Sequence, residues 1–232
     1  LLCALFLAGS AASATPLLER RAAIRAAHAK AEAAAAAKKA AEEAERAARA
    51  PQALLNGMDQ RIEAAQRTPG DARSALELTQ ALRDLLRDNP DARVREGALV
   101  RVPAVEALAN QAVATHPSEA PLLLMEKASL VFNAGRKGEV EALVHASMDA
   151  RPNLDAALAL MGIHARRGEK ARIPAVCQHT RPHLFREPQV WTLLEACRKL
   201  ALTPEAGLAW ASPEDKAFYF READRRATAP VP

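Results

Sequence analysis

Residues 17–50 form a long run dominated by Ala, Glu, Lys and Arg that contains neither glycine nor proline. These four residue types are among the strongest helix formers. At a rise of 1.5 Å per residue, residues 15–50 predict one helix about 50 Å long, which we expect Pro51 to end. Large apolar residues stop after Leu17, Leu18 and Ile24, so the run lacks the apolar seam of a strong coiled coil. We expect a rod exposed to water.

The rest of the chain also predicts helices. Only 3% of the 232 residues are aromatic and only 9 are glycine, so the residues that strands and hairpin turns favour are scarce. The sequence therefore predicts an all-α protein. The formal charge of +4 comes from Lys and Arg interleaved with Asp and Glu, without a block of one sign. We do not expect nucleic acid as a partner.

The first fourteen residues, LLCALFLAGSAASA, form an apolar run that ends in small residues. Such a run is typical of a signal peptide, with cleavage expected before Thr15. A membrane anchor or a buried helix is the alternative, but spanning a bilayer takes about 20 apolar residues and this run is shorter. We expect an exported protein with no transmembrane helix once residues 1–14 are removed.

After that removal two cysteines remain, Cys177 and Cys197. An oxidising compartment would permit a disulfide between them, and the alternative is a pair of buried, inert thiols.

From Pro51 onward the sequence reads as a series of helical hairpins. Apolar residues recur at helical spacing from Leu54 to Ile62, and a second helix begins at the capping residue Asp71 and ends before Pro90. We expect a second, shorter hairpin to be divided at Pro103.

The strongest internal similarity aligns residues 116–150 with residues 151–181, each with a proline in second place, Pro117 and Pro152. A third copy is expected from Pro188, with a short second helix near residues 204–210. A final helix, capped by Ser212, should run to about residue 227, followed by a disordered tail over residues 228–232.

This pattern resembles the tetratricopeptide repeat, a two-helix unit of about 34 residues. In the best copy Ala128 stands at the small-residue position, Gly135 at the turn, Val140 and Ser147 on the second helix, and Pro152 at the close. The family's first-helix Trp and Tyr are mostly Leu and Val here. The resemblance implies an α-solenoid over residues 51–227 whose concave groove holds a peptide. With the leader and the rod, it also suggests an analogy to bacterial envelope proteins of the Tol-Pal type, and hence a periplasmic or secreted location.

No motif for catalysis or for a cofactor is found: the sequence lacks a Gly-rich phosphate loop, a nucleophile elbow, HExxH and paired CxxC. We therefore expect no enzyme, no cofactor and no metal. A metal carrier that uses Cys177, His179 and His183 is the weaker alternative, since Pro182 disturbs the helix that would align the two imidazoles.

Candidate partner-binding residues are few. Arg166, Arg167, Lys170 and Arg172 surround the Gly168 turn and could meet an acidic peptide, a lipid head group or a cell-wall polymer. Solvated turn charges are the alternative. Trp191 could anchor a ligand, although tryptophan at helical spacing more often belongs to a core.

The sequence thus favours a non-catalytic adaptor that binds a protein or peptide partner through the repeats. The alternative is a structural protein whose rod oligomerises or spans the envelope. The oligomeric state and the partner stay open.

Overall fold

The computed structural model describes residues 15–228, with side chains described at residues 28, 30–43 and 50–228. This part of the chain is helical and contains no strand, which confirms the all-α prediction. The chain divides into two compact units between Ala53 and Leu54. The leader expected over residues 1–14 and the last residues of the expected tail, 229–232, lie outside the described residues.

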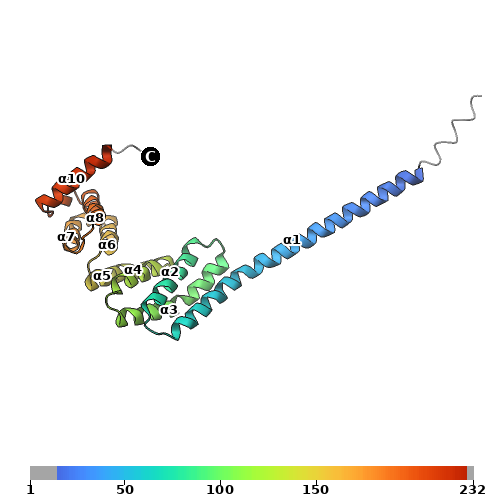
Figure 1. The fold of residues 1–232 in the computed structure, drawn as a ribbon, viewed down its shortest axis with the longest axis horizontal. Helices are drawn as coiled ribbons and strands as arrows, with labels where there is room; N and C mark the ends of the chain where they lie inside the picture. Colours follow the sequence, from blue (N-terminus) through green and yellow to red (C-terminus); the bar gives the residue numbers. More distant parts are fainter. Residues whose placement is uncertain (1–14, 229–232) are drawn as a thin grey trace, which may run out of the picture. The chain divides into compact units, whose positions relative to one another are not determined.

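Helix α1 (Thr15–Gln66) includes the predicted rod but does not end with it (Figure 1). The expectation that Pro51 breaks the helix is wrong, because the helix continues through this residue to Gln66. In the rod, all described side chains from residue 30 to residue 43 are exposed. Lys38 and Glu42 lie 3.9 Å apart, one helical turn from each other. From Leu55 to the end of α1, the apolar side chains of Leu55, Met58, Ile62 and Ala65 are instead buried.

Three helices meet at the start of the second unit: the end of α1, α2 (Ala72–Asp88) and α3 (Ala92–Thr115). Asp71 caps α2 as predicted, because its carboxylate accepts a hydrogen bond from the amide of Ser74 at 3.0 Å. Asp59 of α1 receives two hydrogen bonds from the guanidinium of Arg101 in α3, at 2.7 and 2.5 Å. The buried residues of this core are Met58, Ile62, Ala65, Leu78, Leu82, Leu86, Ala98, Val102, Val105, Leu108 and Leu130.

The hairpin expected to divide at Pro103 is a single helix, α3, so this prediction is also wrong. A proline in a helix interior costs about 3 kcal/mol because it removes a hydrogen bond and crowds the preceding turn. On both sides of Pro103 the buried stripe of α3 continues, with Val102 and Val105 almost fully buried. Burial of one such side chain is worth about 1.5–3 kcal/mol, so the stripe outweighs the proline.

The next four helices are α4 (Ala120–Asn133), α5 (Lys137–Ala150), α6 (Leu154–Arg166) and α7 (Ile173–Thr180). The turns that join each pair contain Gly135 and Gly168, whose φ angles are 83° and 77°. This left-handed conformation favours glycine. Short 3₁₀ turns, η1 (Lys170–Arg172) and η2 (Arg181–His183), flank α7.

The last helices are α8 (Glu187–Leu200), the short α9 (Pro204–Leu208) and α10 (Pro213–Thr228). Ser212 caps α10 as expected, because its hydroxyl accepts a hydrogen bond from the amide of Asp215 at 3.1 Å. Asp215 also binds the guanidinium of Arg181 at 2.7 Å, which ties the start of α10 to η2.

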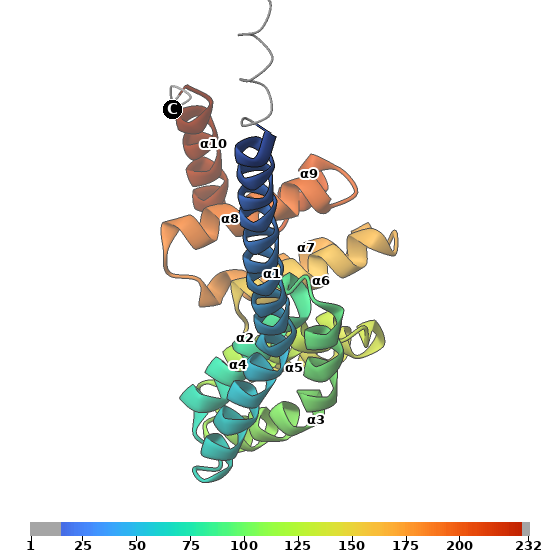
Figure 2. The same cartoon turned by 90° about the vertical axis from the view of Figure 1, so that its right-hand side faces the viewer.

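Within the second unit, contacts between helices follow the chain. Helix α2 packs on α3 and α4, α4 on α5, α6 on α7 and α8, and α8 on α9 and α10. Figure 2 shows the unit from a second side. A large core joins α4 to α10 and includes Leu160, Met161, Leu193, Leu194 and Tyr219.

Candidate binding groove

A depression in the second unit has a volume of about 470 Å³. It lies where the end of α4, the start of α5 and the end of α6 meet. Its lining residues are Phe132, Lys137, Gly138, Val140, Glu141, Ile163, Arg166 and Arg167.

The turn at Gly135 places the main apolar residue of this depression. Leu130 and Val131 are fully buried in the last turn of α4, and Phe132 next to them is 50% exposed. The chain then reverses at Gly135, and the ammonium of Lys137 lies 5.6 Å from the centre of the Phe132 ring. A cation at this distance from an aromatic face is attracted to it.

A second depression of about 220 Å³ adjoins the first, because Phe132 and Val140 line both. It extends along α4 past Ala128 and reaches Arg83 and Arg87 of α2. We call the two depressions together the groove. The groove therefore follows one side of α2, α4 and α6, with the start of α5 at its edge.

The α2 end of the groove has its charges paired within the chain. Arg83 forms ion pairs with Glu126 of α4 and with Asp84. Arg87 lies 2.8 Å from a carboxylate oxygen of Asp88. The arginines at this end already have carboxylate partners.

The α6 end of the groove keeps cations that have no such partner. Arg167 donates two hydrogen bonds to the carboxylate of Glu141, at 2.8 and 2.5 Å. These bonds hold the pKa of Glu141 below its ordinary value. Lys137 and Arg166 are exposed and, among the described residues, neither forms an ion pair with a carboxylate. This end therefore carries an excess of positive charge.

The predicted basic cluster divides between two places. Arg166 and Arg167 line the groove. Lys170 and Arg172 lie in the 3₁₀ turn η1, exposed and outside the groove lining, and Arg172 is 3.5 Å from Glu169. Of the four predicted cations, Arg166 and Arg167 are therefore the two that line the groove.

Trp191 also lies outside the groove lining. Its ring stacks on Tyr219 of α10, with centroids 5.0 Å apart and planes 10° apart. The guanidinium of Arg226 lies 4.6 Å from the Trp191 ring. These contacts join α8 to α10, and Trp191 packs against the core as a partly buried residue.

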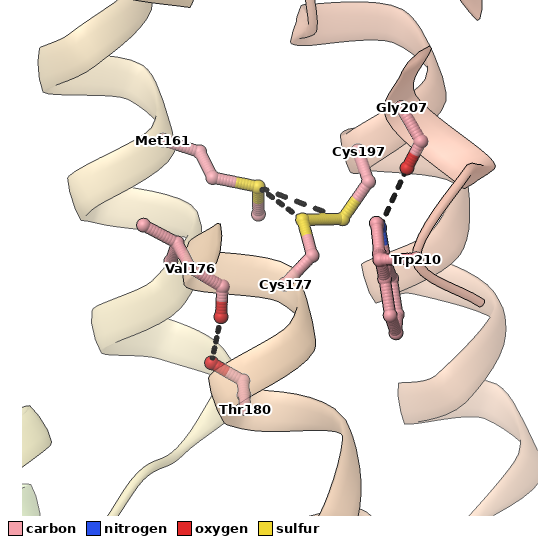
Figure 3. The surroundings of a disulfide bond; sticks show 7 residues. All are labelled: Met161, Val176, Cys177, Thr180, Cys197, Gly207 and Trp210. Carbon is pink, nitrogen blue, oxygen red and sulfur yellow. Dashed lines mark hydrogen bonds between the residues drawn. A yellow bond between two sulfur atoms is a disulfide. The ribbon is translucent and has the colours of Figure 1, made fainter. Parts of the chain in front are cut away.

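Cys177 of α7 and Cys197 of α8 form a disulfide bond, with Cα atoms 6.4 Å apart (Figure 3). Both residues are fully buried. The sulfur of Met161 packs on the bond, 3.3 Å from the Cys177 sulfur and 3.9 Å from the Cys197 sulfur. The disulfide therefore links the short helix α7 to the helix that follows it.

The disulfide also removes the thiolate from the alternative metal site. The rings of His179 and His183 have centroids 6.3 Å apart, while the Cys177 sulfur is bonded inside the core. Over residues 15–228, no three His, Cys, Asp or Glu side chains with described positions gather closely enough to hold a metal ion.

Buried polar groups in the unit serve the fold. The hydroxyl of Ser147 donates to the carbonyl of Pro121 at 2.8 Å and so ties α5 to the start of α4. His164, which is 5% exposed, pairs through Nδ1 with the Glu169 carboxylate at 2.9 Å across the Gly168 turn. Each of these groups is engaged by a neighbour in the same or the adjacent hairpin.

Comparison with protein-family models, with curated proteins and with solved structures finds no match. Within the part of the chain that the structure describes, none of the helices combines the length and the apolar character needed to cross a bilayer.

Sequence reasoning did not single out Phe132, Lys137 or Ile163 as binding residues. The spacing along α4 gives no signal for Phe132, because this residue follows the buried Ala128 by one helical turn and so lies on the same side of the helix.

Proposed function

We propose that this protein is a non-catalytic scaffold or adaptor that binds a segment of a partner protein in the groove. The observation that carries the proposal is the half-exposed Phe132 between two adjoining depressions. Binding sites for ligands are concave and mostly apolar, with a few polar groups that fix orientation. Val140 and Ile163 add apolar surface, and the charged side chains stand at the edge.

The helix order supports a tetratricopeptide-like solenoid for this unit. Helix α2 contacts α4 and α6 contacts α8, as expected when successive hairpins stack, while α6 meets the preceding hairpin through α5. Ala128 packs as a buried small residue in α4, and Gly135 and Gly168 occupy equivalent turns. Helices α4 and α6 are the first helices of the two best-matching predicted units, and both border the groove together with α2.

The location proposed is the bacterial cell envelope. The signal-peptide prediction supports export, and the disulfide between Cys177 and Cys197 suits an oxidising compartment. A scaffold in that compartment would recruit a partner through the groove.

Site-specific photo-crosslinking in native cells tests this proposal. A photoreactive phenylalanine analogue replaces Phe132, and the same analogue replaces Phe185, which is 89% exposed and outside the groove lining. We expect a discrete protein to be captured from position 132 and not from position 185. The same products from both positions, or none from position 132, would contradict the proposal.

A further inference from the structure

We propose that the partner segment is acidic as well as apolar: an apolar side chain enters the depression beside Phe132, and a carboxylate next to it pairs with Lys137 and Arg166. This inference rests on the proposed function and adds the chemistry and the direction of the bound segment. Its acidic end lies towards α6.

Charge complementarity determines the direction in which the partner segment lies in the groove. At the α2 end, Arg83 and Arg87 already pair with carboxylates of this chain, so an acidic partner would have to compete for them. At the α6 end, Arg167 is held by Glu141. Lys137 and Arg166 are the groove cations without an ion-pair partner among the described residues, and both line the same depression.

The apolar part of the depression determines the other feature of the partner segment, its apolar side chain. Phe132 is 50% exposed, and Val140 and Ile163 beside it are only partly covered. Removing such surface from water contributes roughly 25 cal/mol per Å², whereas an exposed ion pair contributes at most about 1 kcal/mol. The apolar contact therefore supplies affinity, and the carboxylate selects and orients the segment.

A protein segment fits this combination better than a nucleic acid. Nucleic-acid binding relies on many cations that follow a phosphate backbone, and two unpaired cations beside an apolar depression are too few. Extended or helical peptides instead use side-chain anchors with neighbouring charges for specificity.

Selection from a random peptide display library on the full chain tests the inference. Four proteins are compared: the unaltered chain, Phe132→Ser, the double variant Lys137→Glu/Arg166→Glu, and a matched control, Arg61→Glu/Arg221→Glu. The control makes the same change in charge at exposed residues outside the groove lining. Circular dichroism verifies that all four fold alike.

We expect peptides selected on the unaltered chain to pair Asp or Glu with Leu, Ile, Phe or Trp. Their affinity, measured by fluorescence anisotropy, should fall about tenfold or more in Lys137→Glu/Arg166→Glu, since two favourable pairs become repulsive. It should stay within about twofold in the control. Selection on Lys137→Glu/Arg166→Glu should enrich basic peptides instead.

The two proposals fail in different ways. Peptides that need Phe132 but are neutral or basic would overturn the acidic partner and leave the groove as a binding site. Selected peptides that bind Phe132→Ser unchanged, or no enrichment on any protein, would overturn both. Enrichment of acidic peptides that bind the double variant and the unaltered chain equally would overturn the direction assigned here.

Discussion

Tyr219 joins α10 to the rest of the second unit through both its ring and its hydroxyl. The ring stacks on Trp191, and the buried hydroxyl donates a hydrogen bond to the carboxylate of Glu195. Burial raises the pKa of Glu195, but hydrogen bonds from Lys199 and Tyr219 outweigh burial and hold that pKa below its ordinary value. Burial and the hydrogen bond to Glu195 both raise the pKa of Tyr219.

Tyr219→Phe keeps the stacked ring and removes this hydrogen bond. We expect a loss of about 1–2 kcal/mol in the free energy of unfolding near neutral pH, since the bond reaches a charged, partly buried carboxylate. Because the pKa of Glu195 is lowered from its ordinary value of 4.5, the stabilisation by this hydrogen bond is complete above pH 4.5 and is lost as the pH falls below it. Because the pKa of Tyr219 is raised from its ordinary value of 10.0, the same stabilisation is complete below pH 10.0 and is lost as the pH rises above it.

Thermal melts of both proteins from about pH 3 to about pH 11 measure this window, because the ordinary pKa values of the two groups, 4.5 and 10.0, lie inside that range. The difference in melting temperature between the two proteins should be largest near neutral pH and should shrink at acid and at alkaline pH. In a Glu195→Gln background the loss of the difference at acid pH should disappear. A difference that is constant with pH would show that the hydroxyl contributes no ionisation-linked stability.

At the scale of helices, the sequence predicted which segments are helical better than where helices end. The predicted starts of α8, α9 and α10 are close to those observed, and each of these helices carries proline in its first turn, where its missing N–H costs nothing. The errors fall at Pro51 and Pro103, inside α1 and α3. Local propensity predicts a break there, but at α3 the buried stripe that continues past the proline decides otherwise.

The groove was harder to predict than the helices. Val140 was predicted as a repeat position and Arg166 and Arg167 as partner-binding residues, and all three line it. The sequence did not indicate that Lys170 and Arg172 lie in η1 outside the groove lining, or that Glu141 pairs with Arg167. These outcomes depend on how separate hairpins pack, which spacing within one helix does not describe.

The disulfide is an element-scale contact, since it holds α7, only 8 residues long, against α8. The bond closes a loop with a sequence separation of 20, which on the chain-entropy model contributes about 3 kcal/mol. We expect Cys177→Ala/Cys197→Ala to lower the free energy of unfolding by about that amount.

Urea unfolding with and without a thiol reductant measures this effect. Reductant should lower the midpoint of the unaltered chain and leave that of the double alanine variant unchanged. Because both cysteines are fully buried, the native protein should react slowly with the reductant until urea loosens α7. An equal response of both proteins would exclude a stabilising role for the bond.

At the scale of the whole molecule, the two units differ in how they are stabilised. The described buried hydrophobic residues all lie at Leu55 or beyond, and the rod side chains described over residues 30–43 are exposed. The rod therefore depends on helix propensity, whereas the second unit depends on its core. Removing one should not unfold the other.

Deletion of residues 15–50 tests this independence and separates the adaptor from the structural alternative. We expect the shortened chain to unfold cooperatively at the same urea midpoint, because it keeps the described core from Leu55 to Tyr219. Circular dichroism should show a loss of helical signal in proportion to the residues removed. By sedimentation, its mass should fall only by that of the deleted segment, since the rod offers no apolar seam for self-association. If the full chain instead sediments as a multiple of the shortened one, the rod assembles the protein, and the structural role would be favoured over the adaptor.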